Sequence, residues 1–126
     1  NIIITFFSNV NHLDVSIQLT LFNQILQNFV QNAIKFTPNE KSIAIRLRKT
    51  KEKIIITVTD EGIGIPENVD LFAPFKRIGN QSGVGLGLFL AKNAADALRA
   101  KITLVNRDDD KTGCIAKLVL NHTSKV

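Results

Sequence analysis

The spacing of apolar and polar positions divides the first third of the chain into one strand and one helix. Ile2 to Phe7 is a short run rich in β-branched and aromatic residues, which predicts a strand. From about Val15 to Phe36 the period becomes helical, and one side of that helix would carry Phe22, Ile25, Leu26, Phe29, Val30, Ala33 and Phe36. Pro38 then predicts the end of the helix.

Four further strands are predicted, in two pairs. Ser42 to Thr50 and Lys53 to Thr59 are joined by a charged turn and indicate a hairpin. Lys101 to Arg107 and Cys114 to Leu120 form a second pair around the turn Asp108 to Gly113. Between the pairs, Asn68 to Gly83 has weak periodicity and indicates a mobile connection.

A second helix is predicted from Leu86 to about Leu98. One half of it would carry Leu88, Leu90, Ala91, Ala94, Ala95, Ala97 and Leu98, and the other half Lys92, Asn93 and Asp96. Phe89 falls on the polar half, where it is either an ordinary surface residue or a contact for a partner.

The order of strand, helix, two strands, helix and two strands predicts the fold class. It favours an α/β two-layer sandwich, with one mixed sheet of about five strands and the helices packed on a single face. A chain of 126 residues is the size of one domain, so we expect residues 1 to 126 to fold together.

The net charge of +5 would suit a polyanion such as nucleic acid. Many of the cations lie between Lys41 and Lys53, where Arg46 and Arg48 share a strand face opposite Ile45 and Leu47. That alternation is typical of the solvated face of a one-sided sheet, so we expect no nucleic-acid partner.

The cysteine content and the hydropathy bear on cellular location. The single Cys114 has no partner for an internal disulfide, and no Cys/His cluster indicates zinc, so a reducing compartment, the cytoplasm, is expected. No apolar run approaches the roughly 20 residues that span a bilayer. Because the chain begins with Asn1 rather than Met, we expect a piece of a longer protein whose other parts could hold a membrane anchor.

Three polar residues on the first helix could bind phosphate and metal. Asn28, Asn32 and Lys35 fall within an arc of roughly 60 degrees beside the apolar side of the helix. An amide carbonyl oxygen suits magnesium beside phosphate oxygens, and a lysine adds a cation for phosphate. The alternative is a hydrated helix flank with no ligand.

Asp60 directly follows a predicted strand and precedes glycines. A carboxylate at that strand end faces the crevice where open α/β sheets bind ligands, and it can accept a hydrogen bond from the exocyclic amine of adenine. Gly62 and Gly64 would let the backbone approach a base closely. The alternative is a simple Asp-Gly turn.

Gly83, Gly85 and Gly87 precede the second helix, whose free N–H groups favour phosphate. Their spacing matches neither G-x-G-x-x-G nor the Walker A loop, so this signal is weak by itself.

Taken together, four segments resemble a known family. N-F-V-Q-N-A-I-K-F (Asn28 to Phe36), D-E-G-I-G-I-P (Asp60 to Pro66), L-F-A-P-F (Leu71 to Phe75) and G-V-G-L-G-L (Gly83 to Leu88) resemble the N, G1, F and G2 boxes of the catalytic and ATP-binding domain of sensor histidine kinases. That domain belongs to the superfamily that also contains gyrase, the ninety-kilodalton heat-shock chaperone and MutL. The resemblance implies a Bergerat α/β sandwich that holds ATP and Mg²⁺ between the N-box helix and a lid.

The resemblance also implies roles for individual residues. Asn28, Asn32 and Lys35 would be catalytic, with Asn32 as the Mg²⁺ ligand and Lys35 on the phosphates. Asp60 would read adenine, Phe72 and Phe75 would anchor the lid, and Arg77 would reach phosphate. The full nucleotide-binding set is Asn28, Asn32, Lys35, Phe36, Asp60, Gly62, Gly64, Ile65, Phe75, Lys76, Arg77, Gly83, Val84, Gly85, Leu86, Gly87 and Leu88.

Asn28 bears on the type of reaction. Relatives that hydrolyse ATP usually have a Glu there as general base, and an amide cannot take a proton. The resemblance therefore implies a protein-histidine kinase that transfers the γ-phosphate to a histidine on a separate dimerisation domain. A response regulator would act downstream, and the isolated domain would be a monomer within a homodimeric whole.

Two alternatives remain open. Ala73 stands where the family often has an acid, and Gln18 where an Asp commonly precedes the N-box helix. These departures and Phe89 leave room for a degenerate regulatory or interaction module that binds nucleotide without transfer. An ATPase of the gyrase or chaperone type is the other alternative, and Asn28 disfavours it.

Overall fold

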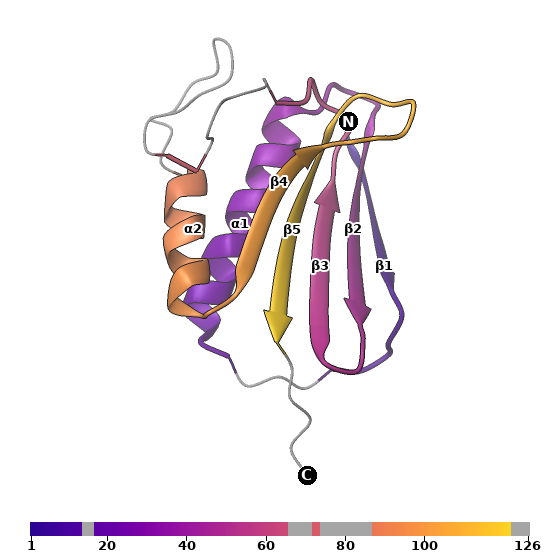
Figure 1. The fold of residues 1–126 in the computed structure, drawn as a ribbon. Coiled ribbons are helices and arrows are strands. Elements are labelled where there is room, and N and C mark those ends of the chain that lie inside the picture. The colour runs from indigo at the N-terminus through magenta and orange to yellow at the C-terminus, as the bar shows by residue number, and fades with distance from the viewer. Residues whose placement is uncertain (14–16, 66–71, 74–86, 122–126) are drawn as a thin grey trace.

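A computed structural model describes residues 1–13, 17–65, 72–73 and 87–121. Figure 1 shows two helices beside one sheet, with both helices on the same face. In chain order the elements are β1 (Ile3–Ser8), α1 (Leu19–Phe36), β2 (Ser42–Lys49), β3 (Lys53–Thr59), α2 (Gly87–Ala97), β4 (Lys101–Asn106) and β5 (Cys114–Asn121).

The sheet has the strand order β1-β2-β3-β5-β4. β1 pairs in parallel with β2, whereas the other three neighbouring pairs are antiparallel. α1 and α2 pack on each other and share one face of this sheet, as Figure 1 shows. The two-layer α/β sandwich with a mixed sheet is therefore confirmed.

The predicted element boundaries were accurate for the strands and less so for α1. Each strand begins and ends within one residue of its prediction, but α1 begins at Leu19 and not near Val15. Ile17 explains the difference, because it packs against the core from outside the helix and so extends the apolar pattern upstream. At the N-cap, Gln18 makes no side-chain hydrogen bond to the first turn.

The core lies between the helices and the sheet. Its largest fully buried side chains come from both layers, and they are Phe29, Ile25, Ile43, Ile54, Leu118 and Val58. Along β3 the buried positions alternate with more exposed ones, which is the pattern of a sheet covered on one face. The predicted apolar side of α1 is confirmed, since Ile25, Phe29 and Ala33 are buried.

α2 is covered over a narrower stripe than its sequence predicts. Ala91, Ala94 and Ala95 are buried, whereas Leu90 is 40% exposed and Ala97 is also exposed. Small side chains let the helix approach its neighbours closely, and that contact covers only one arc of the helix. Leu90 and Ala97, predicted on the apolar half of the helix, therefore lie outside this buried stripe, and Phe89, predicted on the polar half, is half-buried.

The uncovered face of the sheet carries the basic side chains, as expected. Arg46 and Arg48 are exposed, and the Arg46 guanidinium lies 5.0 Å from the centroid of the Phe7 ring. Among the described residues, no helix is long and apolar enough to cross a membrane.

Candidate functional site

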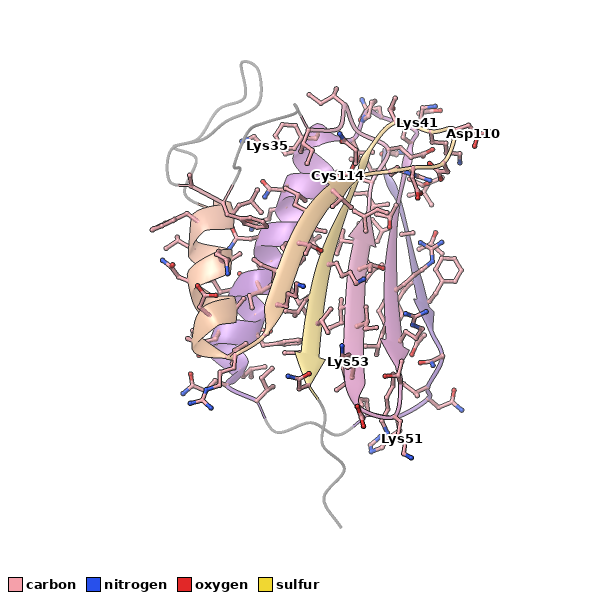
Figure 2. The ribbon with its side chains drawn as sticks, in the orientation of Figure 1. Lys35, Lys41, Lys51, Lys53, Asp110 and Cys114 are labelled. Atoms are coloured by element: carbon pink, nitrogen blue, oxygen red, sulfur yellow. The ribbon has the colours of Figure 1, made fainter. Side chains whose placement is uncertain are left out.

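A cavity opens between the two layers, near the C-terminal end of α1 and the start of β5. Figure 2 shows Lys35 of α1 and Cys114 of β5 at this end of the molecule, opposite Lys51 in the β2–β3 turn. The cavity contains about 460 Å³ of empty space, including space open to solvent. Its lining residues are Phe29, Asn32, Ala33, Phe36, Val58, Asp60, Gly64, Ile65, Leu88, Leu104, Cys114 and Ala116.

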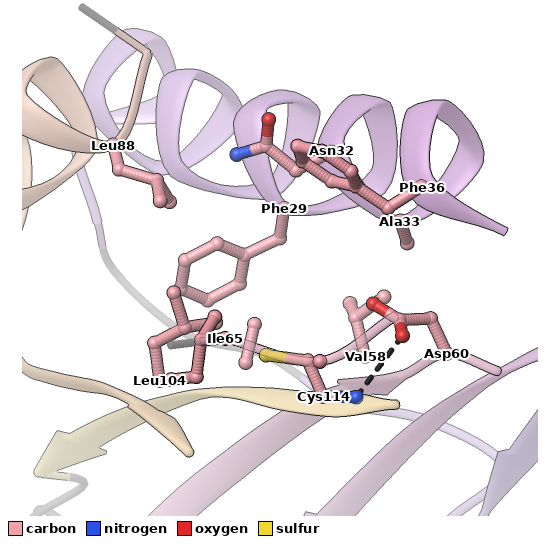
Figure 3. Close-up of a pocket in the computed structure, with 12 residues that line it drawn as sticks. Phe29, Asn32, Ala33, Phe36, Val58, Asp60, Ile65, Leu88, Leu104 and Cys114 are labelled. Atoms are coloured by element: carbon pink, nitrogen blue, oxygen red, sulfur yellow. Dashed lines mark hydrogen bonds between the residues drawn. The ribbon is translucent and has the colours of Figure 1, made fainter. Parts of the chain in front are cut away.

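Asp60 follows the last residue of β3 and is only 7% exposed. Its Oδ1 accepts two backbone N–H groups, from Gly62 at 2.9 Å and from Cys114 at 3.0 Å. The second carboxylate oxygen is turned into the cavity, as Figure 3 shows. One oxygen is therefore committed to the fold and the other faces any ligand in the cavity.

Burial determines the acidity of this part of the cavity. It raises the pKa of Asp60 above its ordinary value of 3.8, while the N–H groups of Gly62 and Cys114 and the charge of Arg107 pull that pKa downward. Burial, together with the negative charge of Asp60, also raises the pKa of the Cys114 thiol to about 12. Cys114 is consequently a neutral thiol near pH 7.

The β4–β5 hairpin supports Asp60 from the other side. The backbone N–H of Asp60 donates to the Cys114 carbonyl at 2.9 Å, and Arg107 Nη1 donates to the Asp60 carbonyl at 3.0 Å. Two hydrogen bonds to Asp109 hold the Arg107 guanidinium, from Nε at 3.1 Å and from Nη2 at 2.6 Å. Gly113 has φ +137°, and a Cβ there would overlap the Asp60 carbonyl oxygen.

Glu61 anchors the next residue of this corner to β2. Its Oε2 accepts the backbone N–H of Ser42 at 2.7 Å and the Ser42 hydroxyl at 3.0 Å, and these two bonds lower the pKa of Glu61. Lys111 Nζ lies 3.5 Å from the other carboxylate oxygen. Hydrogen bonds therefore connect the residues that follow β3 to both neighbouring strands, Asp60 to β5 and Glu61 to β2.

The two glycines after Asp60 have different roles. A Cβ at Gly62 would lie 2.7 Å from the Phe36 carbonyl oxygen, so this glycine allows the chain to pack against the end of α1. Gly62 is not among the lining residues. Gly64 does line the cavity, and its φ of +80° is a conformation that favours glycine.

Of the three polar residues predicted beside the apolar side of α1, only Asn32 lines the cavity. Phe36, one turn later, also lines it. Asn28 is outside the lining: its Nδ2 donates to the Gln24 carbonyl at 2.7 Å, and a Cβ at Gly87 would lie 2.6 Å from its Oδ1. Lys35 is exposed, with its Nζ 5.7 Å from the centroid of the Phe36 ring.

The predicted residues downstream of Pro66 are only partly described. Leu88 of α2 lines the cavity, and Gly87 packs against Asn28. Phe75, Lys76, Arg77, Gly83, Val84, Gly85 and Leu86 lie outside the described residues.

Several residues of the site did not stand out in the sequence. Leu104 and Cys114 line the cavity. Arg107 and Gly113 contact the backbone of Asp60, and Asn106 holds the backbone of Ile65. The available signals were weak: Gly113 was recognisable only as a turn residue, and Asn106 only as a polar residue at the end of a strand.

This geometry agrees with the comparison to known families. Residues 18–123 match the family of histidine kinase-, DNA gyrase B- and HSP90-like ATPases. The chain belongs to this family. The match includes every described residue that lines the cavity, so the Asp60 corner and the Asn32 flank are parts of the family's ATP-binding domain.

Similar proteins place the chain within the sensor-kinase branch. Over 88 residues it is 34% identical to sensor protein KdpD of Mycobacterium tuberculosis, covering 66% of this chain and 10% of that protein. Over 126 residues it is 29% identical to sensor protein CiaH of Streptococcus pneumoniae, covering 94% of this chain and 28% of that protein.

Solved structures agree. The catalytic domain of histidine kinase ThkA superimposes with a TM-score of 0.84 at 30% identity, covering 97% of this chain and 80% of that one. This is an ATP-binding catalytic domain of the sensor histidine kinase type. The chain spans only about a tenth to a quarter of the length of the KdpD and CiaH relatives that it matches.

Proposed function

We propose that the cavity binds the adenine base of Mg-ATP and that the domain transfers the γ-phosphate to a histidine on a separate domain of a longer protein. One observation carries the proposal: Asn32 on α1 and Asp60 after β3, which are 28 residues apart in the sequence, line the same cavity. One molecule of Mg-ATP could therefore place its metal and phosphates at the Asn32 amide and its base at the Asp60 carboxylate.

The divided role of the Asp60 carboxylate supports adenine over guanine. Its Oδ1 is occupied by two backbone N–H groups, so only the other oxygen is available to a ligand. An ionised carboxylate only accepts hydrogen bonds, which suits the exocyclic amine of adenine. Guanine has a carbonyl at the corresponding position, and two acceptors repel each other.

The cavity walls suit a flat aromatic base. Phe29, Ile65 and Leu104 give the cavity an apolar wall, which Figure 3 shows on the side away from Asp60. Burial of the two faces of a purine against such side chains removes apolar area from water, worth about 25 cal/mol per Å². Affinity would then come from the apolar walls and base selectivity from Asp60.

The described residues also fit a magnesium ion bound together with phosphate. Mg²⁺ in nucleotide sites commonly uses one or two side-chain oxygens together with phosphate oxygens and water, so a single amide oxygen from Asn32 is sufficient. No cluster of His, Cys, Asp or Glu among the residues the structure describes offers a competing metal site. When bound, the ion would neutralise charge on the phosphates.

The side chains around the cavity favour transfer over hydrolysis. Asn28 donates its amide N–H to Gln24 and cannot accept a proton from water. Of the described lining residues, only Asp60 and Cys114 have ionisable side chains, and Asp60 is committed to the base end. We therefore assign positioning and charge neutralisation to this domain, with the attacking group on its partner.

Calorimetry of Mg-ATP and Mg-GTP binding to the unsubstituted chain, Asp60→Asn and Asp110→Asn tests nucleotide recognition. The asparagine keeps an acceptor for Gly62 and Cys114, but can present an N–H₂ donor to the adenine amine. We expect ATP affinity to fall by about tenfold to a hundredfold in Asp60→Asn, since a hydrogen bond to a charged group is worth about 1.5–3 kcal/mol. Asp110 is exposed on the hairpin, so its variant serves as the matched control.

Equal and unmeasurable heats for both nucleotides in the unsubstituted chain would count against the proposal. Transfer is tested separately by incubating the domain with γ-labelled ATP and the dimerisation domain of its own protein. Labelled phosphohistidine is the expected product. Nucleotide binding without phosphohistidine would favour the regulatory module, and phosphate release well above background from the domain alone would favour an ATPase.

The likeness to sensor kinases extends the proposal to the whole protein. ThkA has been solved in complex with the response regulator protein TrrA, and that kinase matches this chain with a TM-score of 0.78 at 28% identity. We propose a response regulator as the downstream partner here, a homodimer for the intact protein and a cytoplasmic location for this domain.

A further inference from the structure

The side chain of Asn106, the last residue of β4, pairs with the backbone of Ile65. Its Oδ1 accepts the Ile65 N–H at 2.7 Å, and its Nδ2 donates to the Ile65 carbonyl at 2.9 Å. A side-chain amide has the same donor and acceptor as a peptide group, so Asn106 pairs with Ile65 much as a neighbouring strand would. The two residues are 41 positions apart in the sequence, so this contact is a product of the tertiary fold.

Gly64 fits against the same amide. Its φ is +80°, and a Cβ on this residue would lie 2.7 Å from Asn106 Oδ1. A side chain at position 64 would therefore push the Asn106 amide away from Ile65, in addition to being strained by the backbone conformation. Gly64 and Asn106 thus depend on each other.

The residues held in this way form part of the cavity. Gly64 and Ile65 both line it, and so does Leu104, which lies two residues before Asn106 and on the same face of β4. Figure 3 shows Ile65 and Leu104 next to each other. The Asn106 amide therefore fixes this wall at the point where the chain leaves the Asp60 corner.

We propose that Asn106 is a positioning residue that holds Gly64 and Ile65 in the shape that receives the base. Only the identity of the ligand rests on the proposed function; the role of Asn106 in shaping the wall does not. Asparagine is well suited to the role, because aspartate would lack the donor for the Ile65 carbonyl and leucine would lack both groups.

Amide hydrogen exchange of the nucleotide-free chain, resolved by residue, tests this role. We expect exchange at the Ile65 N–H to accelerate at least about fivefold in Asn106→Leu, because the variant removes the acceptor of that N–H. Asn106→Asp keeps the acceptor, so its Ile65 amide should exchange at an intermediate rate. The amides of Ile56 and Val58 in β3 should be unaffected, which distinguishes a local effect from general destabilisation.

Nucleotide affinity gives the second readout, with Asn121→Asp at the exposed end of β5 as a matched control. We expect the Kd for Mg-ATP to rise about fivefold in Asn106→Leu, less in Asn106→Asp and not at all in the control. Unchanged Ile65 exchange in Asn106→Leu would overturn the inference about Asn106. Failure of the unsubstituted chain to bind ATP would instead count against the proposed function, and the exchange result would still decide the role of Asn106.

Discussion

The Asp60 carboxylate accepts the backbone N–H of Cys114 at 3.0 Å, across the junction between the end of β3 and the start of β5. This bond connects residues 54 positions apart and leaves the other carboxylate oxygen facing the cavity. Asp60 is therefore both a structural link between two strands and the proposed reader of the base. The two roles can be separated by substitution.

Asp60→Ala and Asp60→Asn should differ strongly in stability. Alanine leaves the buried N–H groups of Gly62 and Cys114 without their acceptor, and we expect the free energy of unfolding to fall by about 3 kcal/mol. Asparagine retains an acceptor oxygen and should stay within about 1 kcal/mol of the unsubstituted chain. Urea unfolding measures both, and equal losses in the two variants would contradict the structural role of Oδ1.

Asp60 should also make stability depend on pH. Because burial raises its pKa above 3.8 in the folded chain, the native state retains a proton that the unfolded state has released between those two pKa values. The stabilising contribution is thus complete below pH 3.8 and disappears as pH rises through the folded pKa. As pH rises, the unfolding free energy of the unsubstituted chain should therefore fall relative to that of Asp60→Asn.

The lowered pKa values of Glu61 and Asp109 act in the opposite direction, with stability lost as pH falls. Both groups are present in the two proteins compared, so their effects cancel in the difference. A difference in unfolding free energy that does not change with pH would contradict the raised pKa of Asp60.

Nucleotide binding supplies a second test of the Asp60 pKa. ATP affinity should weaken as pH falls through the raised pKa of Asp60, since only the ionised carboxylate is purely an acceptor.

Gly113→Ala should be among the most damaging small substitutions. The residue has φ +137°, and an added methyl group would overlap the Asp60 carbonyl, which is backbone and cannot rotate away. We expect a loss of about 3 kcal/mol or more in urea unfolding. Thr112→Ala, at the exposed neighbouring position, is the control and should change stability by less than about 0.5 kcal/mol. A loss below about 1 kcal/mol for Gly113→Ala would show that the hairpin can relax.

Gln18→Asp should stabilise the domain. Gln18 is the N-cap of α1 and makes no side-chain hydrogen bond there, while the first turn contains no acidic residue. A short carboxylate can accept a free N–H of that turn and interacts favourably with the helix dipole, together worth about 1 kcal/mol. Gln27→Asp, at an exposed position inside the same helix, should be neutral or slightly destabilising. The melting temperatures of both variants would reveal whether the effect belongs to the cap.

The elements of the fold were predictable because their signals are local. Alternation along β3 and helical spacing along α1 each arise from one face that must be buried, and both are visible within a short window of sequence. The errors came from contacts outside that window. Ile17 packs on the core without being helical, and Leu90 has the character of a core residue but is 40% exposed.

The candidate site was predictable only in part. Asn32, Asp60 and Gly64 were recognisable from local motifs, and the structure brings them to one cavity. Gly62 was expected to shape the base pocket, but its missing side chain allows contact with Phe36. Asn106 could not be recognised, since its importance lies in a pairing with Ile65 that sequence spacing does not encode.

The amino-acid sequence by itself determined the period of each segment and the chemistry of its special residues: an amide-bearing helix flank, and an acid followed by glycines at the end of a strand. Only the tertiary structure decided which groups meet. The order β3-β5-β4 brings the start of β5 and the end of β4 to the Asp60 corner. Strand order and register arise from packing and hydrogen bonds between distant segments, whereas periodicity reports only on neighbours along the chain.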